Sequence, residues 1–491
     1  MSQYARGEVF AGSREAFARI EGWLAGPEAA GLSLAGLEDQ LAVRGREIQR
    51  RLLQDHLCAR AAAEPLLARV TGPDQVARTR AERGHARSLS SVFGPVTVSR
   101  IAYRAPGTAA VHPLDAELGL PAGRHSPGLA EMTAAGAARG SLEQACVQVR
   151  ARTGCKLGTR QAQQLVRAAA ADSGGFYAHR PAPLAVAGEV VVLSCDAKGI
   201  RMRPGELRPR AERLARSSVP QQDGRLSQGE VRTRRRMAAA GAVWVITPAP
   251  RTAGDILGPG PRADGPQVRH KWLTASVADD AAAVIAAVFA EADRRDPAHE
   301  RAWIALADGN KDQIRQIQAQ AAARKITVTI ICDLIHVTEH LWDAAWCFFP
   351  RASAGAGRWV RARTAQILDG GPAGPAAVAA ALRQAAAGLG KTRRKTAEKT
   401  AGYLEAKAPH LDYPQALAAG WPIATGVIEG ACRHLVKDRM DITGARWGVQ
   451  TAEAILKLRA ITANGDFDAY WTWHLQQEHH RNHPASCTLA A

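Results

Sequence analysis

The sequence predicts an α/β core that is interrupted by an all-helical insertion and preceded by a mostly helical N-terminal region. Three observations support this. Three apolar segments each end in an aspartate, an alanine-rich helical block separates the last of them from a final helix, and residues 1–85 are rich in helix formers. With 491 residues the chain is too long for one ordinary core, so we expect two to four domains.

Composition limits the classes of partner. The net charge of +18 favours a polyanion, and nucleic acid is the first candidate, although a solvated basic surface is the alternative. The eight cysteines include no CxxC pair, so neither a zinc ribbon nor a disulfide framework is indicated. The N-terminus lacks the apolar segment of a signal peptide, and no run of about eighteen apolar residues predicts a membrane span. We therefore expect a cytoplasmic protein.

The N-terminal region, residues 1–110, is predicted to be helical with a small β-hairpin. Leu34–Ala63 carries apolar residues at helical spacing and is expected to pack on other helices, with dimerisation as an option. Ser91–Arg104 contains two short β-rich runs around Gly94-Pro95, which predicts a hairpin. Its Arg100 and Arg104 could contact phosphates or form an ordinary solvent face.

Residues 111–180 are predicted to hold a helix-turn-helix. One helix begins near Ser141 and ends at Gly154, and Thr159 could cap a second. Two short helices joined by a glycine-containing turn match this DNA-binding motif, although any helical hairpin looks similar. The second helix offers three side chains able to bind bases or phosphates, Arg160, Gln164 and Arg167.

Residues 188–336 form the first part of the predicted core. Val190–Leu193 indicates a buried strand that leads to Asp196, and an arginine-rich loop is expected over Ile200–Arg236. Two further strands and a helix follow, at Gly241–Pro250, Lys271–Val277 and Ala278–Arg294. A single aspartate at a strand end is weak evidence, because many such residues only cap a turn.

The same pattern recurs twice. Arg301–Asp308 is an apolar strand that ends in a carboxylate and precedes helix Lys311–Ala323, and Lys325–His336 contains a third strand that ends at Asp333. We expect all three aspartates at the carboxyl edge of one sheet. Residues 337–420 are predicted to be an all-helical insertion, and residues 421–465 to return the chain to the core. Residues 466–491 are predicted to be a flexible tail.

The final helix opens at Gly426 and has Glu429 in its first turn. Arg433 and Lys437 follow at offsets of four and eight, so they are expected on the same face. They could hold a DNA backbone, and a surface ion pair with Glu429 is the alternative. About three carboxylates suit two Mg²⁺ ions about 4 Å apart, the arrangement that cleaves phosphodiesters without a covalent intermediate. The predicted order of strands and helices is the one that a ribonuclease-H-like fold requires.

Several stretches also resemble the DDE transposases of the ISKra-type bacterial insertion sequences, relatives of the Mutator superfamily. The resemblance is carried in order by VLSCDAKGIRMRP, GAVWVITPAPRT, LADGNKDQI, CDLIHVTEHLW and GVIEGACRHLVKDRMDITGARW, and covers most of the chain. It implies that Asp196, Asp308 and Glu429 are the catalytic, metal-binding triad. Asp333 and His336 match a C/D-x-x-H motif of that superfamily.

Asp333 would orient a metal ligand, with a role as the third metal ligand as the weaker alternative, and His336 would orient a carboxylate or contact a phosphate. A capping aspartate with a packed histidine is the alternative. The expected function is binding of terminal inverted repeats, followed by Mg²⁺-dependent cleavage and strand transfer, with Mn²⁺ as a substitute metal. Double-stranded DNA, both transposon ends and target, and a second copy in a synaptic homodimer are the expected partners, in a bacterial cytoplasm or on its nucleoid. The alternatives are a nuclease without strand transfer and a domesticated DNA-binding protein.

Overall fold

The computed structural model divides the chain into two compact units. One comprises Met1–His179 with Asp466–Ala491, and the other Arg180–Gly465. The structure describes residues 9–203, 205–209, 212–213, 235–258, 264–351, 353–442, 444–484 and 489–490. Among these residues, no helix combines the length and the apolar character that crossing a membrane requires. The units are described separately below.

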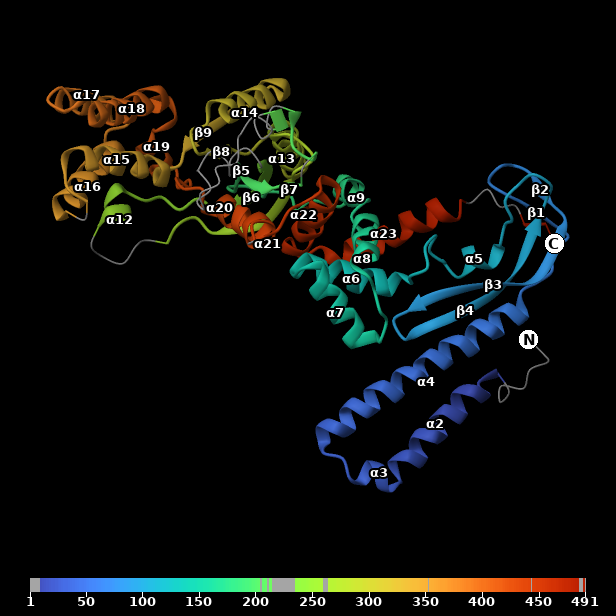
Figure 1. Cartoon of the computed structure of the whole chain (residues 1–491). Coiled ribbons are helices and arrows are strands. Elements are labelled where there is room, and N and C mark those ends of the chain that lie inside the picture. The colour runs from blue at the N-terminus through green and yellow to red at the C-terminus, as the bar shows by residue number, and fades with distance from the viewer. Residues whose placement is uncertain are drawn as a thin grey trace. The chain divides into compact units, whose positions relative to one another are not determined.

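The first unit combines helices with a long hairpin (Figure 1). Strands begin at Arg69, so the helical prediction for residues 1–85 was wrong from that point. The hairpin is also longer than predicted, because the polar segment Arg80–Ser91 pairs with Gly94–Arg104 along its length apart from one bulge. Its elements are α2 (Ala11–Leu24), α3 (Pro27–Ala30), α4 (Leu34–Ala63), β1 (Arg69–Thr71), β2 (Ala77–Arg78), β3 (Arg80–Ser91), β4 (Gly94–Arg104), α5 (Pro113–Glu117), α6 (Pro127–Arg139), α7 (Leu142–Thr153), α8 (Thr159–Ala169), α9 (Ser173–His179), α23 (Phe467–Asn482) and β10 (Leu489–Ala490).

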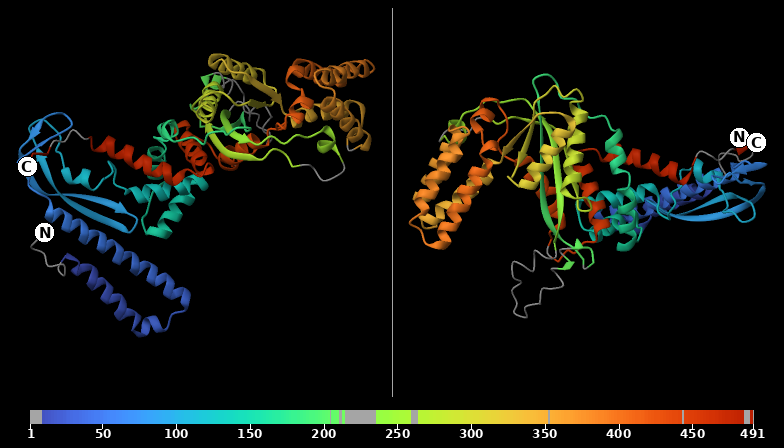
Figure 2. Two further views of the ribbon diagram at one scale, coloured as in Figure 1. Left: turned by 180° about the vertical axis from the view of Figure 1, so that it is seen from behind. Right: turned by 90° about the horizontal axis from the view of Figure 1, so that it is seen from above.

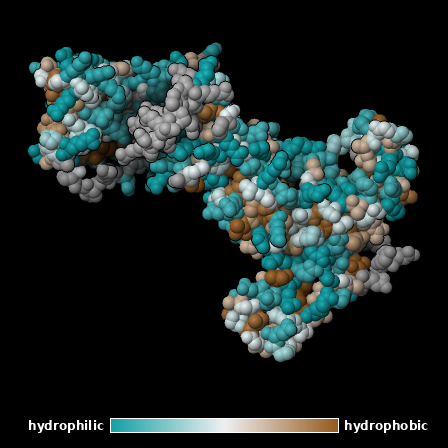
Figure 3. Space-filling model, viewed as in Figure 1, coloured by the Kyte–Doolittle hydropathy of each residue, from teal (hydrophilic) through white to brown (hydrophobic). Residues whose placement is uncertain are grey.

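Helix α4 leaves much of its apolar surface exposed. Leu57 is its one buried residue, whereas Leu34 is 73% and Val43 56% exposed. Figure 3 shows brown apolar atoms among the teal polar ones on this helical arm. The expected packing of α4 against other helices is therefore realised only in part, through α2 and the strand β4.

The two hairpin arginines that were expected to contact phosphates or solvent, Arg100 and Arg104, are engaged within the first unit. Arg100 is buried and its guanidinium lies 2.7 Å from a carboxylate oxygen of Asp115. The expectation that Arg100 contacts phosphates or solvent was wrong, because this ion pair takes it into the core. Arg104 forms an ion pair with Glu82 at 2.9 Å.

Helices α7 and α8 occur where the sequence predicted a helical pair. Gly154 ends α7 in the left-handed conformation, with φ of 72°, which only glycine adopts without strain. Thr159 is the first residue of α8 and not its cap, because Gly158 takes that position. Arg160, Gln164 and Arg167 lie on the exposed side of α8, opposite its buried residues Ala162, Val166 and Ala169.

The predicted flexible tail is instead helix α23 over most of its length. Tyr470, Trp471 and His474 are buried, and the Tyr470 hydroxyl donates to the carbonyl of Ala169 at 2.5 Å. Asp172 accepts from His474 at 2.6 Å and forms a salt bridge with Arg481. The histidines suggested a polar tail, but one of them and two aromatic residues anchor it by burial.

The second unit is built on a five-stranded mixed sheet in the order β7-β6-β5-β8-β9. The pairs β5–β6 and β6–β7 are antiparallel, whereas β5–β8 and β8–β9 are parallel. Every predicted strand of this region is present. The bounds are β5 (Val190–Arg201), β6 (Arg235–Ile246), β7 (Val268–Ser276), β8 (Trp303–Ala307) and β9 (Val328–Cys332). β5 continues to Arg201 and β6 begins at Arg235, so Asp196 lies within β5 and not at its end, and the loop expected at Ile200–Arg236 is shorter at both ends. The centre of that loop, residues 214–234, lies outside the described residues.

Helices cover both faces of this sheet, which explains why Ala238–Ile246 is buried throughout. Helix α13 packs on β5, β6 and β7, so closely that a Cβ on Gly241 would lie 2.4 Å from the Val288 side chain. Helix α20 packs on β5 and β6, and α22 on β7 (Figure 1). The bounds are α13 (Ala281–Arg295), α14 (Lys311–Arg324), α20 (Gly426–Ala431), α21 (Asp438–Met440) and α22 (Val449–Ala463).

Between β9 and α20 the chain is helical, as predicted for residues 337–420. Helices α17 and α18 lie side by side, and α18 also packs on α15 (orange in Figure 2). The bounds are α15 (Leu334–Phe348), α16 (Ala354–Asp369), α17 (Ala373–Ala386), α18 (Lys391–Lys407), a 3₁₀ turn at Ala408–His410 and α19 (Tyr413–Ala418). A short helix from earlier in the chain, α12 (Ala253–Leu257) between β6 and β7, contacts α16.

The end of this helical block is held against the segment after β6. The Ala249 amide donates to the carbonyl of Gly420 at 3.0 Å, and Arg251 contacts Trp421 through the backbone carbonyl. Gly420 has φ of 72°, and a Cβ there would lie 2.4 Å from the Ala249 nitrogen. Gly420 is therefore needed for both its conformation and this close approach.

Gly420→Ala should destabilise the second unit by about 2–4 kcal/mol, because left-handed strain of about 1 kcal/mol adds to an overpacking cost of about 1–3 kcal/mol. Gly465→Ala is the matched control. Its φ is 76° and no atom lies within 4 Å of the new Cβ, so it should cost only the strain. Urea unfolding of the full chain measures both, and equal costs would contradict the role assigned to the contact with Ala249.

Candidate functional site

The three predicted aspartates meet at one edge of the five-stranded sheet. Parallel register pairs Ser194 with Leu306 and Ala307 with Cys332. Asp196, Asp308 and Asp333 therefore follow the paired ends of three neighbouring strands, with β8 in the middle. This edge is the place where an α/β sheet presents functional side chains.

Helix α14 fixes the Asp308 loop against β5. The Asp308 carboxylate accepts from the Asn310 amide at 2.8 Å, and Asn310 caps the helix through the Asp312 and Gln313 amides. The Gln313 side chain then donates to the carbonyl of Cys195, the residue before Asp196. This bond ties the Asp196 and Asp308 segments together.

Asp196 also lies against the final helical segment. Its carboxylate accepts from the Ala197 amide at 2.6 Å and contacts the thiol of Cys432. Burial and the Asp196 charge raise the pKa of the Cys432 thiol, so this thiol stays protonated as a donor. Cys432 lies one helical turn after Glu429, and the helix therefore brings Glu429 to the same edge.

A separate group of three could hold a metal ion. Among the described residues, Asp333, His336 and Glu429 each offer one ligand atom, and these atoms lie within 4.8 Å of one another. The sequence paired Glu429 with Asp196 and Asp308, gave Asp333 an orienting role, and kept Asp333 as a weaker candidate for the third metal ligand. The structure instead places Glu429 next to Asp333 and His336.

The Thr425 hydroxyl connects two members of this group. It contacts a carboxylate oxygen of Asp333 and lies 2.9 Å from Oε1 of Glu429. A hydroxyl has one proton, so it can donate to only one of these two anions. The other carboxylate lacks that donor, and a bound cation would compensate its charge. This donor set therefore fits a metal ion.

The charges within the group are strongly coupled. Asp333 is completely buried, which by itself would raise its pKa, but His336, Thr425 and the Ile335 amide lower the pKa below its usual value. The Asp333 carboxylate in turn raises the pKa of His336 to about 9, with Nδ1 and Oδ2 3.6 Å apart. At neutral pH, before any metal binds, the group is thus an anionic aspartate beside a cationic imidazole.

Helix α18 closes over the Asp308 side of the edge. The Tyr403 hydroxyl lies 3.5 Å from the Asp308 carbonyl oxygen. A Cβ on Gly309 would lie 2.8 Å from this hydroxyl, so only glycine fits there. The Tyr403 ring packs on His340 with centroids 4.0 Å apart, and His340 is one turn beyond His336 on α15.

The final helix widens directly after Glu429. Cys432–Lys437 is a π-helical turn, a distortion that often marks functional sites. The prediction that Arg433 and Lys437 share a face with Glu429 assumed α-helical spacing, which does not hold in this turn. Both side chains are exposed, and Arg433 lies 3.9 Å from Asp438.

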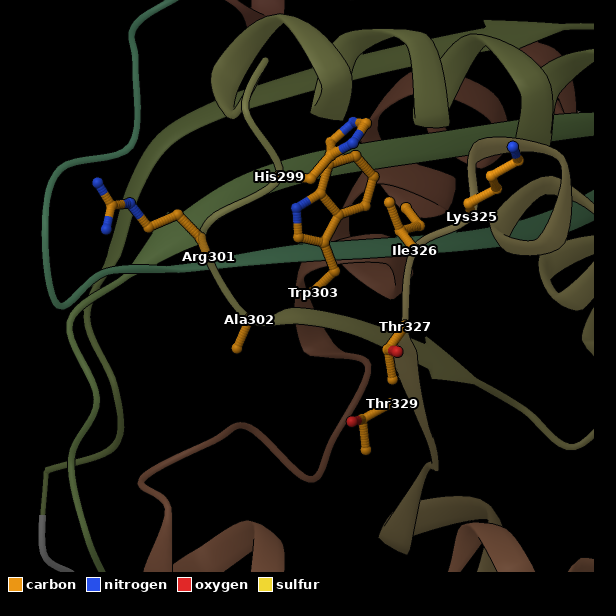
Figure 4. A pocket seen from close by; sticks show the side chains of 8 residues that line it. All are labelled: His299, Arg301, Ala302, Trp303, Lys325, Ile326, Thr327 and Thr329. Atoms are coloured by element: carbon orange, nitrogen blue, oxygen red, sulfur yellow. The ribbon is translucent and has the colours of Figure 1, made fainter.

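A pocket of about 370 Å³ lies at the opposite, amino-terminal ends of β8 and β9 (Figure 4). Its lining includes Arg301, Lys325 and Trp303, and Trp303 is buried. The pocket contains none of the carboxyl-edge acids, so it is separate from the candidate site.

No protein-family model matches the chain, and no curated protein matches it significantly. The assignment of a site therefore depends on geometry. Sequence reasoning missed Thr425, Tyr403, Gln313 and Cys432 as parts of this edge. Thr425 precedes Glu429 by four residues, the helical spacing that could have identified it.

Removing either carboxylate of the group should weaken metal binding. We expect Asp333→Asn and Glu429→Gln to lower Mn²⁺ affinity by more than about 10-fold, because each removes a ligand charge. Thr425→Val should lower it by about 10-fold or more, because residues that hydrogen-bond to metal ligands contribute nearly as much to affinity as the ligands. Titration calorimetry measures the affinity. Asp343→Asn, an exposed acid on the same helix as His336, is the control. Unchanged affinity in Asp333→Asn and Glu429→Gln would exclude this group as a metal site.

Proposed function

We propose that this chain is a DNA transposase with a ribonuclease-H-like core and a two-metal mechanism. The observation that carries the proposal is the convergence of four acids, Asp196, Asp308, Asp333 and Glu429, on one sheet edge and the helix that crosses it. The sheet order is the one expected for this fold. On one side of β5, β6 pairs antiparallel with β5 and β7 pairs antiparallel with β6, and on the other side β8 and β9 run parallel to β5. The basic charge of +18 agrees with a DNA substrate.

In the proposal, Asp196, Asp308 and Glu429 hold Mg²⁺, and Asp333 joins Glu429 in the same oxygen-rich site. When bound, two such ions would supply activation of the attacking oxygen and stabilisation of the leaving oxygen of a phosphodiester. Mn²⁺ has similar ligand preferences and would substitute. The cluster of Asp333, His336 and Glu429 supports this part of the proposal without identifying the metal.

The chain's own groups would position the DNA. His336 is 39% exposed and beside the cluster, so a ring N–H can donate a hydrogen bond to a phosphate oxygen. Thr425 keeps the Asp333 and Glu429 carboxylates in fixed orientations. Arg433 and Lys437, both exposed beyond Glu429, would neutralise neighbouring phosphates.

The first unit would recognise the transposon end. Helices α7 and α8 are the proposed helix-turn-helix, with Arg160, Gln164 and Arg167 exposed on the second helix. The helical block from α15 to α19 would be the insertion domain. The exposed apolar residues of α4 would pack on a second copy in a synaptic homodimer, since burying them is favourable.

The test uses end-labelled DNA from both flanks of the chain's own gene, with Mg²⁺ or Mn²⁺. We expect wild type to cut at the element boundary. Asp196→Asn and Asp308→Asn should cut more than about 100-fold more slowly, because loss of even a ligand's partner costs about 10- to 100-fold. Asp312→Asn is the control. Asp312 lies four residues beyond Asp308, is exposed, and forms an ion pair with Arg315.

A target plasmid in the same reaction separates the alternatives. Joining of the labelled end to the plasmid supports a transposase, whereas cutting without joining would indicate a nuclease. Binding without cutting, with either metal, would favour a DNA-binding protein. Equal cutting by wild type and Asp308→Asn would remove Asp308 from the site.

A further inference from the structure

Helix α18 carries a series of exposed lysines that take no part in its packing against the rest of the protein. Lys391, Lys395 and Lys399 are exposed at successive four-residue steps, and among the described residues none has an ion-pair partner within 4 Å. The neighbouring Arg394 differs, because Glu398 pairs with it at 2.8 Å. The helix instead packs through its other side, which consists of Ala397, Thr400, Ala401, Leu404 and Lys407.

The lysine series does not stabilise its helix. The first turn of α18 contains no acid, and its cap, Gly390, has no side chain to bind the free amides. Lys391 in this turn opposes the helix dipole at a cost of about 0.3–1 kcal/mol, and Lys395 and Lys399 lie beyond the reach of that effect. The three charges therefore need an explanation other than helix stability.

The series leads to the candidate site. Tyr403 is the next four-residue step after Lys399, and its hydroxyl lies over Asp308 and Gly309. Thr400 donates to the carbonyl of His340 at 3.0 Å and locks this part of α18 onto α15. Lys399 is close enough to His340 for its charge to contribute to lowering that pKa, after the larger effect of burial.

The spacing fits a nucleic-acid strand. Four residues of an α-helix rise about 6 Å, so Lys391, Lys395 and Lys399 cover about 12 Å and Tyr403 ends the series about 6 Å further on. The distance between successive phosphates of one nucleic-acid strand is similar to the rise of one such four-residue step. An acidic protein partner would explain the charge, but not why the series ends beside Asp308.

We propose that Lys391, Lys395 and Lys399 bind consecutive backbone phosphates of one DNA strand and lead it past Tyr403 to the acids at the sheet edge. This inference rests on the proposed function, because it takes the substrate to be DNA. It assigns to α18 the positioning of the strand beside the scissile phosphate. Contacts of this kind are independent of sequence and strongly dependent on salt.

The test compares two full-length variants that each lose two positive charges. Lys395→Gln/Lys399→Gln should lower the slope of log affinity against log salt by about 2, since each phosphate contact contributes about 1. Arg315→Gln/Lys325→Gln is the control, because both residues are exposed and lie on or just after α14, a helix that packs on α13, β8 and β9. A gene-flank duplex with a fluorescent label is the probe, and cutting by the same proteins is followed in parallel.

The charge-preserving variant Lys395→Arg/Lys399→Arg should keep the wild-type slope, which separates charge from helix packing. If wild type binds and cuts while Lys395→Gln/Lys399→Gln keeps the wild-type slope, this inference fails and the proposed function stands. If the control loses as much slope as the α18 variant, the surface has no special role and the inference also fails. If wild type shows no salt-dependent binding, both proposals fail.

Discussion

The hydroxyl of Thr425 connects two carboxylates that are far apart in the chain, and the candidate site depends on that connection. Asp333 ends β9 and Glu429 lies in α20, yet both contact this one group. Because Asp333 is buried, its charge requires hydrogen bonds to remain tolerable. The backbone reinforces the junction, since the Leu334 amide donates to the carbonyl of Ile423 at 3.0 Å. The strand end and the helix therefore form one rigid support.

The helical block between these two segments is compatible with this junction because it is anchored at several points on the sheet edge. Tyr413 donates to the carbonyl of Cys332 at 2.8 Å, and Thr400 holds α18 to α15. The chain leaves the sheet at Asp333 and returns at Thr425, so a block of any size can be inserted there without disturbing the register of β5, β8 and β9. The same anchors place α18 next to the acids.

Local pattern predicted the strands of the second unit and the aspartates that follow β8 and β9, because buried strands have a strong apolar signature. It placed Asp196 at a strand end, whereas β5 stays paired with β6 as far as Arg201. It failed for β3, whose sequence RAERGHARSLSS is polar and forms a strand only through its pairing with β4. It failed for α23, which is ordered by burial against distant residues such as Ala169. The contact between Thr425 and Asp333 was also beyond it, because a side-chain contact across 92 residues leaves no local signal.

The acids are arranged in an order that has a chemical consequence. Strand β8 lies between β5 and β9, so Asp308 is the middle acid, about 4.8 Å in strand spacing from each neighbour. The crossing helix has a matching span: Thr425 meets Asp333 and Cys432 meets Asp196, seven residues or about 10 Å apart. That distance is about two strand spacings. In the proposed function, Asp196, Asp308, Asp333 and Glu429 would together hold the metal ions, and Asp308 is the acid that neighbours both outer ones.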